Sequence, residues 1–471
     1  MTTATGTGRR PNVVLINCDD LGYGDLGCYG SQVNKTPTLD GLARDGLRFD
    51  SFYMASPVCS PSRGALLTGC YPPRIGFGSF DGMPVLFPGQ AVGLPATEVS
   101  LGALLSSAGY RTQMVGKWHC GDQEAFLPTN HGFDHYFGLP YSNDMGRQAP
   151  AASGPFAARE GREPFQLAPL PLLADGEVIE QQPDQSSLTE RYVVEAVRFL
   201  RAARHEPFFL YLAHLYVHVP IYVQERFARQ SGNGPYGAAV ESIDWATQVL
   251  LHELRALGLE EDTIVIFTSD NGSRGVDGGS NQPLRGAKTT TWEGGMRVPC
   301  IVRWPGRIEP GRVTGEVATS MDLYPTLAAL CGAALPDDRT IDGRDISPLL
   351  LGDDAASPHD AFYYYWMNDL EAVRCGRWKL HFAKHGVLGT ELYDLEVDPG
   401  ETTDVAGSNP EVVADIESRA ELARTSLGDA LQGRTGDDVR AIGRVDDPRT
   451  LTTYDPDHPY YLSEYDLSDR G

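Results

Sequence analysis

Several features that would assign a protein class at once are missing from the sequence. Only 39 basic side chains stand against 63 acidic ones, which gives a formal net charge of −24, and no run of Lys or Arg forms a basic patch. Such a chain repels nucleic acid phosphates and anionic membrane surfaces, so we expect neither as a partner. The longest early apolar run, 13–16, is far too short for a signal peptide or a membrane span. We therefore expect a cytoplasmic protein, or an exported one whose leader has been removed.

The eight cysteines exclude two further classes. They include no CxxC pair and no Cys/His cluster of zinc spacing, and the chain is too long for a disulfide-stapled scaffold, so most of them are expected to be reduced. The remaining composition, with 41% hydrophobic and 22% charged residues, is that of a soluble globular protein rather than a disordered chain or a coiled coil. The 52 Gly and 33 Pro favour a fold rich in loops.

The pattern of apolar runs predicts an α/β fold. Short β-branched or apolar runs are each followed by Gly, Asp or Asn and then by a helical pattern, which is typical of a buried, mainly parallel sheet flanked by helices. The predicted strands are 12–17, 113–116, 208–213, 263–269 and 298–303. The predicted helices include 38–46, 100–109, 188–203 and 236–257.

The alternation changes near residue 361, which predicts a second unit. Short strands separated by turns indicate a smaller antiparallel sheet, followed by an amphipathic helix with Pro at its start. These strands are 362–366, 372–375, 378–382 and 391–395, and the helix is 410–427. We therefore predict a catalytic α/β domain over 1–355, an antiparallel-sheet subdomain over 356–430, and an irregular acidic tail over 431–471 that packs on the body.

Acidic residues follow two of the predicted strands directly. Asp19 and Asp20 come after the first strand, and Asp270 and Asn271 come after the strand 263–269. Sites in open α/β sheets form at the carboxyl ends of the strands, and an all-oxygen set of ligands suits Ca²⁺ or Mg²⁺. Asp after a strand is often only a turn former. Two such pairs at equivalent places nevertheless favour a metal site.

A cysteine lies where a loop turns into a helix. Pro61 is a favoured residue of a first helical turn, which places Cys59 at the helix N-terminus and Arg63 one turn later on the same face. Free backbone N–H groups and the helix dipole favour an anion there. A lone Cys at such a position is more often a buried small residue than a nucleophile. The segment by itself therefore leaves both interpretations open.

Two long motifs resemble known signatures. The stretch 59–63 with its flanks resembles the first signature of the sulfatases, and 109–119 resembles the second, in the right order. The resemblance covers nearly the whole chain except the last 40 or so residues and a variable stretch over about 146–187. It extends through Asp19-Asp20, Asp270-Asn271-Gly272, Gly286-Ala287-Lys288, Trp292-Glu293-Gly294-Gly295, Leu392-Tyr393-Asp394 and Asp398-Pro399-Gly400-Glu401.

The resemblance implies the fold, the nucleophile and the metal. The fold would be the alkaline-phosphatase-like α/β fold, with a large mixed, mainly parallel sheet. A maturation enzyme would oxidise Cys59 to formylglycine, whose hydrate has two hydroxyls, so that one can attack sulfur and the other can lose a proton to expel sulfate. The metal, Ca²⁺ or possibly Mg²⁺, would be held by Asp19, Asp20, Asp270, Asn271 and the modified Cys59.

The resemblance also implies roles for the basic residues. Arg63, Lys117 and Lys288 would form a positive well for a sulfate ester. His119 would take the diol proton during sulfate release, while His218 and Lys288 would protonate or stabilise the leaving oxygen. Ser142, in a short motif resembling an arylsulfatase loop, would contact the sulfate together with Lys117, His218 and Lys288. His214 is expected to be a packed strand histidine instead.

These features together predict a sulfuric ester hydrolase. The substrate would be a sulfated carbohydrate or an aryl sulfate, and the motifs resemble the arylsulfatase and N-acetylgalactosamine-sulfatase branch. Specificity is expected to lie in loops such as 146–187. One alternative is a phosphonate monoester or phosphodiester hydrolase of the same superfamily. Another, from a different class, is a non-catalytic calcium-binding or carbohydrate-binding protein in which Cys59 stays unmodified.

Overall fold

A large mixed sheet forms the centre of the computed structural model, which describes residues 10–147, 167–352 and 355–460. In the described chain this sheet has 11 strands in the order β11-β2-β10-β9-β1-β8-β4-β5-β6-β7, and β12 pairs with β2. The strands are β1 (Asn12–Cys18), β2 (Leu47–Tyr53), β4 (Arg111–Gly116), β5 (His135–Gly138), β6 (Pro171–Ala174), β7 (Glu177–Gln181), β8 (Phe208–Ala213), β9 (Thr263–Ser269), β10 (Arg297–Arg303), β11 (Arg312–Thr314) and β12 (Ala318–Thr319).

The five central strands, β9, β1, β8, β4 and β5, are parallel; four of them were predicted, and β5 was missed. The strand predicted over 298–303 exists as β10, but it runs antiparallel to both β9 and β2, so its assignment to the parallel set was wrong. A parallel neighbour needs a connection that crosses the sheet, usually a long helix. Between β9 and β10 the chain forms loops and only the four-residue helix α7 (Glu293–Met296), which do not cross the sheet. The strand β10 therefore starts at the edge where β9 ends, and runs in the opposite direction.

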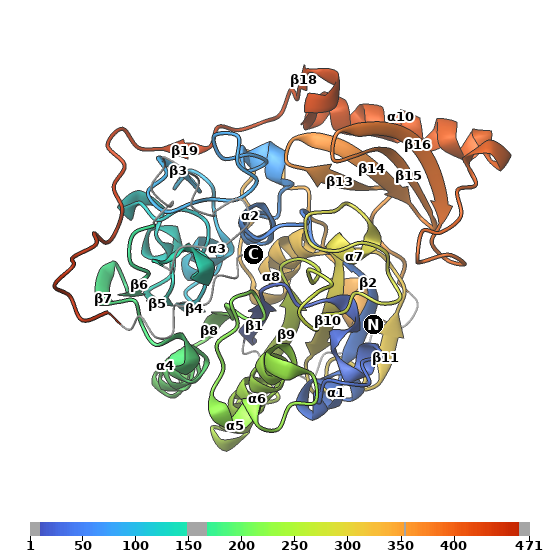
Figure 1. Ribbon diagram of the computed structural model, residues 1–471. Coiled ribbons are helices and arrows are strands. Elements are labelled where there is room, and N and C mark those ends of the chain that lie inside the picture. The colour runs from blue at the N-terminus through green and yellow to red at the C-terminus, as the bar shows by residue number, and fades with distance from the viewer. Residues whose placement is uncertain (1–9, 148–166, 353–354, 461–471) are drawn as a thin grey trace.

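Helices cover both faces of the large sheet (Figure 1). The helices α1 (Pro37–Arg44), α4 (Leu188–Ala203), α5 (Glu225–Ala228) and α6 (Gly234–Ala256) belong to one face, and α2 (Cys59–Thr68), α3 (Leu101–Ser107), α8 (Leu323–Cys331) and α9 (Ser347–Leu351) to the other. Alternate residues of β1 serve the two layers: Val13 and Leu15 pack towards α2 and α3, and Val14 and Ile16 towards α1, α4 and α6. The fully apolar run of β1 is thereby explained, because both of its faces are buried.

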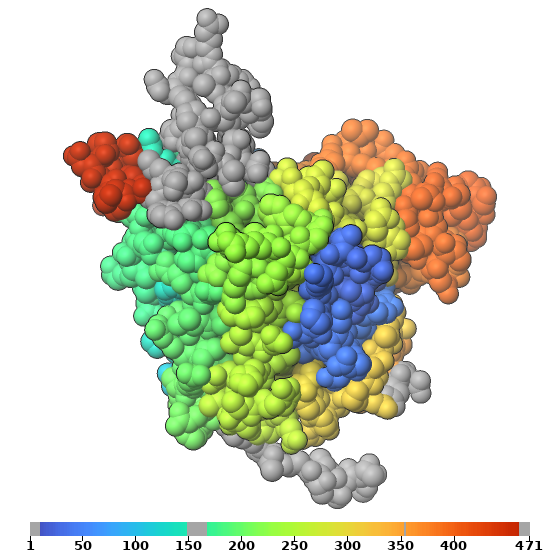
Figure 2. Space-filling model, turned by 60° about the horizontal axis from the view of Figure 1, so that its bottom comes forward, coloured from blue at the N-terminus to red at the C-terminus, as the bar shows by residue number. Residues whose placement is uncertain are grey.

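The C-terminal sheet is antiparallel throughout, as predicted. It consists of β13 (Phe362–Trp366), β14 (Asp369–Cys375), β15 (Trp378–Lys384) and β16 (Val387–Asp394), in that order. The helix α10 (Pro410–Ser426) packs against it. One core cluster includes Tyr53 and Met296 from the large sheet region together with Tyr364 and Leu380, so the two sheets share a buried interface. In Figures 1 and 2 the C-terminal sheet and α10 stand at one side of the molecule, in orange.

The segment after α10 returns over the body of the protein. It forms the short strands β17 (Gly428–Asp429) and β18 (Arg434–Thr435), and then β19 (Gly443–Arg444) pairs with β3 (Val92–Gly93). The domain boundaries remain predictions, and the last residues of the predicted tail, 461–471, lie outside the described chain. Among the helices that the structure describes, none combines the length and the apolar character needed to cross a membrane.

Candidate active site

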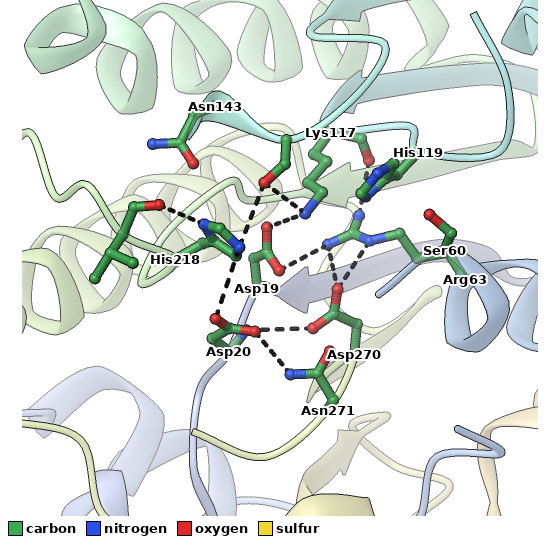
Figure 3. Close-up of polar contacts among 12 residues, drawn as sticks. Asp19, Asp20, Ser60, Arg63, Lys117, His119, Asn143, His218, Asp270 and Asn271 are labelled. Atoms are coloured by element: carbon green, nitrogen blue, oxygen red, sulfur yellow. Dashed lines mark hydrogen bonds and ion pairs between the residues drawn. The ribbon is translucent and has the colours of Figure 1, made fainter. Parts of the chain in front are cut away.

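The strands β1 and β9 deliver three carboxylates to one edge of the large sheet. They are parallel neighbours with Cys18 opposite Ser269, so the residues that follow them leave the sheet side by side. Carboxylate oxygens of Asp19, Asp20 and Asp270 lie within 4.8 Å of one another, and all three side chains are buried (Figure 3). Three negative charges at this distance repel one another unless cations lie among them.

Two buried cations offset part of this charge. Lys117 Nζ lies 2.5 Å from Asp19 Oδ2, and Arg63 Nη2 lies 2.7 Å from Asp270 Oδ2. Burial alone would raise the pKa of Asp19, but the neighbouring cations, Lys117 foremost, hold this pKa well below its usual range. Burial and the charge of Asp19 raise the pKa of Asp270. At Asp270, the neighbouring cations therefore offset only part of the effect of burial and of the charge of Asp19.

The oxygen atoms of this cluster fit a hard divalent cation. Asn271 Nδ2 donates a 2.7 Å hydrogen bond to Asp20 Oδ1, which leaves the amide oxygen of Asn271 for another partner. That oxygen and Asp19 Oδ1 are buried, and neither has a hydrogen-bond partner among the described residues. Buried acceptors without a donor are costly, and carboxylate and amide oxygens are the ligands that Ca²⁺ and Mg²⁺ prefer. Asp19, Asp20, Asp270 and Asn271 could thus hold such an ion.

Cys59 is the first residue of α2, whose ten residues are all buried. The preceding residue, Val58, is extended, so the thiol lies at the helix N-terminus where the free N–H groups favour an anion. Its exposed fraction is 2%. Burial raises the pKa of the Cys59 thiol to about 11, although Lys117 and Lys288 act in the opposite direction. As a plain thiol, Cys59 would stay protonated near neutral pH and would be a poor nucleophile.

His119 is a neutral imidazole with one unengaged nitrogen. Its Nε2 lies 2.9 Å from the carbonyl oxygen of Leu86, which can only accept, so Nε2 carries the hydrogen. Nδ1 is buried and has no hydrogen-bond partner in the part of the chain that the structure describes. Burial, and then Lys117, hold the pKa of His119 well below its usual value. The lone pair on Nδ1 is therefore available to accept a proton.

Ser142, His218 and Lys288 form a second polar group around Asp20. Ser142 Oγ lies 3.4 Å from His218 Nε2 and 3.3 Å from Lys117 Nζ. His218 Nδ1 lies 2.5 Å from the carbonyl oxygen of its neighbour Val219, and Lys288 Nζ lies 3.0 Å from Asp20 Oδ2 (contacts of His218 in Figure 3). Burial and the charge of Lys288 lower the pKa of His218. Although burial acts against its charge, Asp20 keeps the pKa of Lys288 above its usual value.

A cavity of about 120 Å³ opens beside the start of α2. Its polar wall includes Cys59, His119, Ser142, Asp144, His218, Lys288 and Thr289, and its apolar wall includes Val58, Pro84, Val85, Phe87, Met145 and Leu167. The cavity therefore offers hydrogen-bonding groups and a fixed positive charge on one side and an apolar surface on the other. Such a cavity suits an anionic group joined to a less polar one.

The structure divides the predicted catalytic residues into two layers. Arg63 and Lys117 do not line the cavity; Arg63 Nη1 donates to the carbonyl oxygen of Lys117 at 2.7 Å, and both cations bind the carboxylates behind it. The predicted positive well thus contains Lys288 at the cavity and the other two beneath it. His214, predicted to be a packed strand histidine, is buried outside the cavity lining.

Sequence reasoning missed the residues that shape the turn at Asp20. This residue has a φ of +64°, which is unfavourable for a side chain with a Cβ. Ser269 Oγ accepts a 2.9 Å hydrogen bond from Leu21 N, and Asp25 accepts hydrogen bonds from Gly22 N and from Tyr236 Oη. Tyr236 is 211 residues away from Asp25 in the sequence, so no local pattern indicates the pair. Ser269, a hydroxyl residue directly before the predicted ligand Asp270, was the single local sign of this turn in the sequence.

Comparisons with known proteins agree with one family over nearly the whole chain. The model described as Sulfatase matches residues 11–333, and the model described as N-sulphoglucosamine sulphohydrolase, C-terminal, matches residues 287–425. Arylsulfatase A of Homo sapiens is 42% identical over 460 residues, which cover 90% of this chain and 89% of that protein. N-acetylgalactosamine-6-sulfatase of Canis lupus familiaris is 40% identical over 397 residues, which cover 80% of this chain and 73% of that protein.

Solved structures show the same architecture. The crystal structure of Ps i-CgsB in complex with k-i-k-neocarrahexaose has a TM-score of 0.77 and 30% sequence identity, and the match covers 88% of this chain and 92% of that one. The phosphonate monoester hydrolase of Agrobacterium radiobacter has a TM-score of 0.62 and 21% identity, and covers 90% of this chain and 95% of its own. At that identity the second likeness shows the fold alone.

Proposed function

The chain belongs to the sulfatase family and is a sulfuric ester hydrolase, and we propose that it uses the formylglycine form of Cys59 and a divalent cation to release sulfate. The proposal rests on one observation above all. Cys59 begins a buried helix in the wall of a cavity that it shares with the base His119 and the cation Lys288. The nucleophile, the base and the positive charge of this proposal therefore surround one cavity that can accept an anion.

The state of Cys59 supports a modified nucleophile. The buried thiol has a pKa of about 11, and a sulfated thiol would have no internal means of expelling its sulfate. After oxidation by a maturation enzyme, the hydrated aldehyde has two hydroxyl groups. One hydroxyl loses its proton to the solvent as its oxygen forms a bond to sulfur, the bond from sulfur to the ester oxygen breaks, and the departing alcohol gains a proton from His218. His119 Nδ1 then accepts the proton of the second hydroxyl, the bond to the sulfate oxygen breaks, and the aldehyde returns.

Lys288 and His218 serve the departing oxygen in this proposal. Lys288 stays charged because Asp20 supports its ammonium, so it can stabilise the negative charge that develops. His218 starts neutral, with its hydrogen on Nδ1, and becomes an acid after Nε2 has taken up a proton. A bound sulfate anion favours that uptake, because an opposite charge nearby stabilises the imidazolium. Ser142 Oγ orients this Nε2 nitrogen.

The carboxylate cluster would supply the metal chemistry. We infer that Asp19, Asp20, Asp270 and Asn271 hold Ca²⁺, or alternatively Mg²⁺, together with the modified Cys59. A bound divalent cation polarises a sulfate oxygen as a Lewis acid and favours ionised groups at the nucleophile. Lys117 keeps Asp19 ionised, and Arg63 holds Asp270 in place, because each cation binds its carboxylate directly.

The substrate in this proposal is a sulfated carbohydrate or an aryl sulfate. Names of the relatives support both, since they include an arylsulfatase, an N-acetylgalactosamine-6-sulfatase and a solved structure that contains a neocarrahexaose. The small cavity, with one polar and one apolar wall, suits a terminal sulfate and the part of the alcohol next to it. The segment 148–166, within the loops predicted to set specificity, lies outside the described residues.

Mass spectrometry of the Cys59 peptide and kinetics of two variants test the nucleophile. We expect a mass that corresponds to formylglycine in the active protein, and the loss of sulfate-ester hydrolysis in Cys59→Ala without loss of the fold. Cys59→Ser is expected to be nearly as inactive, because serine does not give a diol under the same maturation. Substantial steady-state turnover by the alanine variant would falsify this mechanism. Faster turnover of aryl phosphodiesters than of aryl sulfates at one pH would favour the phosphonate and phosphodiester alternative instead.

A further inference from the structure

Four titratable side chains are buried between the large sheet and the C-terminal sheet, and we name them the clamp cluster: Glu293, Lys379, His381 and Glu401. Each has an exposed fraction of 0%. Glu293 is the first residue of α7, Lys379 and His381 lie on β15, and Glu401 ends the motif Asp-Pro-Gly-Glu. The chemistry proposed above uses none of the four. Their position nevertheless places them directly behind the loop 285–292, which carries Lys288.

The hydrogen bonds of the clamp cluster converge on Lys379 and Glu401. Lys379 Nζ donates hydrogen bonds to Thr291 O at 2.8 Å and to Glu293 Oε1 at 3.0 Å, and forms an ion pair with Glu401 Oε1 at 2.9 Å. Glu401 Oε1 also lies 2.9 Å from His381 Nε2, and Glu401 Oε2 accepts a 2.8 Å hydrogen bond from Glu293 N. Glu401 thereby ties β15 to the main chain at the start of α7.

The C-terminal sheet region holds the loop 285–292 at further points. Thr291 Oγ1 donates a 2.7 Å hydrogen bond to Glu371 Oε2 on β14. Arg285 Nη1 donates a 2.6 Å hydrogen bond to the carbonyl oxygen of Glu401. Both ends of the loop are therefore anchored to residues 371–401, and Lys288 lies between the anchors.

The opposite side of the loop contacts the segments that carry the nucleophile and the metal ligands. Lys288 N donates to Ser273 O at 3.0 Å, and Thr289 N donates to Pro57 O at 2.9 Å. Pro57 lies two residues before Cys59. A displacement of the loop would thus move the Lys288 ammonium relative to Cys59 and to the cavity. The loop transmits the position of the C-terminal sheet to the reacting groups.

Stability alone does not account for the clamp cluster. Two carboxylates and an ammonium removed from water carry a large desolvation penalty, and apolar residues of similar volume are often as stable. Glu401 also has a φ of +49°, an unfavourable conformation for a residue with a side chain. Unfavourable burial and backbone strain persist in proteins where the surrounding structure has to hold a functional segment in one conformation. The geometry fixed here is that of the loop 285–292.

We propose that Glu401 is a positioning residue for Lys288. Through Lys379 and the amide of Glu293 it holds the loop so that the Lys288 ammonium faces the cavity and Asp20. This inference rests on the proposed function, because it is the binding of a sulfate ester that gives the place of Lys288 its importance. The C-terminal sheet then takes part in catalysis without contacting the substrate.

A double-mutant cycle between Glu401 and Lys288 tests the proposal. In Glu401→Gln, an amide with one oxygen replaces a carboxylate with two, so it can no longer bind both the Lys379 ammonium and the amide of Glu293. The loop should therefore lose its anchor at Glu293. For an activated aryl sulfate we expect kcat/KM to fall about 10- to 100-fold, mostly in kcat, because small displacements of a catalytic group have effects of that size. In a Lys288→Ala background the same change is expected to cost less than about 3-fold, since the group to be positioned is absent.

A matched control and a milder variant accompany the cycle. Asp429→Asn removes a buried ion pair with Arg424 Nε, 3.0 Å long, in the C-terminal part of the chain; Asp429 also accepts a hydrogen bond from Leu370 N, but none of its hydrogen bonds and ion pairs among the described residues reaches the loop 285–292. It should lower the melting temperature while leaving kcat/KM within about 2-fold. Arg285→Met, a change of an exposed residue that keeps the cluster charged, should lower kcat moderately and leave the fold intact. Equal losses from Glu401→Gln in both Lys288 backgrounds, or an equal loss in Asp429→Asn, would overturn the proposal.

Hydrogen exchange separates this inference from the proposed function. In Glu401→Gln, and not in Asp429→Asn, amides of 285–296 are expected to exchange at least about 10-fold faster at a temperature where both variants are folded. Unchanged exchange of that peptide overturns the clamp even if the protein hydrolyses sulfate esters. If the wild-type protein hydrolyses none, the proposed function fails, and the exchange result alone then decides whether Glu401 holds the loop.

Discussion

The two histidines of the cavity present different nitrogens to a substrate. Carbonyl oxygens of Leu86 and Val219 fix the hydrogens on His119 Nε2 and His218 Nδ1, so the chemistry falls to His119 Nδ1 and His218 Nε2. Burial lowers the pKa of both, which makes each a neutral base in the free protein. Only His218 has Asp20 beside it, with 3.9 Å between Nε2 and Oδ2, to support a positive charge. In the proposed mechanism, this difference favours His218 as the acid and His119 as the base.

The dependence of the rate on the leaving group should distinguish the two residues. His218→Ala is expected to slow esters of high-pKa alcohols by about 10² to 10⁴, the usual contribution of a general acid, and activated aryl sulfates far less. The reason is that a phenolate of low pKa departs without a proton. The measurement is kcat/KM across a series of sulfate esters with leaving groups of different pKa.

His119→Ala should instead impair a later step for every ester. The proton that His119 accepts belongs to the diol, so the sulfated enzyme should accumulate in this variant and not in His218→Ala, as mass spectrometry of the intact protein can detect. His214→Ala is the control, because His214 lies outside the cavity lining. Equal losses on activated and unactivated esters in His218→Ala, or a steeper dependence in His214→Ala, would show that the acid was assigned to the wrong imidazole.

At the scale of the secondary-structure elements, the carboxyl end of β4 depends on a glycine. Gly116 has a φ of +109°, and a Cβ built on it would lie 1.8 Å from Ala213 O of the neighbouring strand. We expect Gly116→Ala to lower the free energy of unfolding by at least about 2 kcal/mol, because backbone strain of about 1–3 kcal/mol adds to the clash. Activity should fall as well, since Lys117 and His119 follow directly. Urea unfolding measures the first effect and aryl sulfate turnover the second.

Gly407→Ala is the matched control for that substitution. Gly407 lies in the turn Ala406–Ser408, and a Cβ there meets no atom within 4 Å in the described structure. Its free energy of unfolding should change by less than about 0.5 kcal/mol. A loss in Gly407→Ala as large as that in Gly116→Ala would mean that the β4 edge has no special requirement for glycine.

The turn Pro128–His131 beneath the second motif should make stability sensitive to acid. Burial lowers the pKa of His131 to about 4, against about 6.5 in an unfolded chain. Above pH 6.5 both states are neutral, and between pH 6.5 and pH 4 only the unfolded state gains the proton. The contribution of His131 to stability is thus complete above pH 6.5 and falls by about 1.4 kcal/mol per pH unit as the pH drops towards 4. His131→Gln should remove this loss.

Denaturant unfolding of both proteins from pH 7.5 to pH 4.5 measures the effect. The stability advantage of the wild-type protein over His131→Gln should shrink towards acid, by about 2.5 kcal/mol between pH 7.5 and pH 4.5. A difference that stays constant over this range would contradict the assignment of a neutral, buried His131.

The sequence allowed prediction of those elements whose pattern is local. The helix 188–203 matches α4, and the strands 263–269 and 362–366 match β9 and β13, because their apolar periodicity follows from burial of a face. The strand β2 over Leu47–Tyr53 was missed. The consecutive polar residues Asp50 and Ser51 interrupt the alternation of polar and apolar residues there, and the preceding helix was predicted to end later. The direction of β10 depends on the route of its connection, which no local pattern specifies.

For the site, the sequence motifs indicated the residues, but not which of them line the cavity and which bind the carboxylates behind it. The pairs after β1 and β9 predicted the carboxylate cluster, since parallel neighbouring strands end at one edge. The same reasoning could not show that Arg63 and Lys117 face the carboxylates rather than the cavity, because this depends on helix α2 and on contacts over 207 and 98 residues of sequence. Glu401 lies in a motif, but its contact with the loop 285–292 arises only once two sheets pack together.

At the scale of the whole molecule, the carboxylate cluster should link metal binding to folding. Removal of a divalent ion leaves the carboxylates of Asp19, Asp20 and Asp270 within 4.8 Å of one another, and Asp19 Oδ1 and the amide oxygen of Asn271 buried without a hydrogen-bond partner among the described residues. A ligand that binds only the folded state stabilises it by about 2.7 kcal/mol at 100 times its dissociation constant. We expect EDTA to lower the melting temperature and abolish activity, and Ca²⁺ to restore both. Thermal unfolding with and without the ion measures this.

Asp270→Ala is the variant that localises the ion. It should lose most of the bound metal, as measured by elemental analysis of the dialysed protein, along with activity. Asp40→Ala, a change of a carboxylate on helix α1 that binds Thr36 and the amide of Cys28, should retain the metal. Full metal content and wild-type activity in Asp270→Ala would place the ion elsewhere in the molecule.

The burial of helix α2 has a consequence for the timing of synthesis. All ten of its residues are inside the protein, Cys59 at its first position is 2% exposed, and Ser62 and Arg63 of the same helix bind Asp270, which directly follows β9. An enzyme the size of a protein cannot reach such a thiol without removing α2 from its place. The segment 56–69 is accessible only until β9 has joined the sheet, some 200 residues later in the chain. The oxidation proposed for Cys59 would therefore have to precede folding, and a molecule that folds first would keep the thiol.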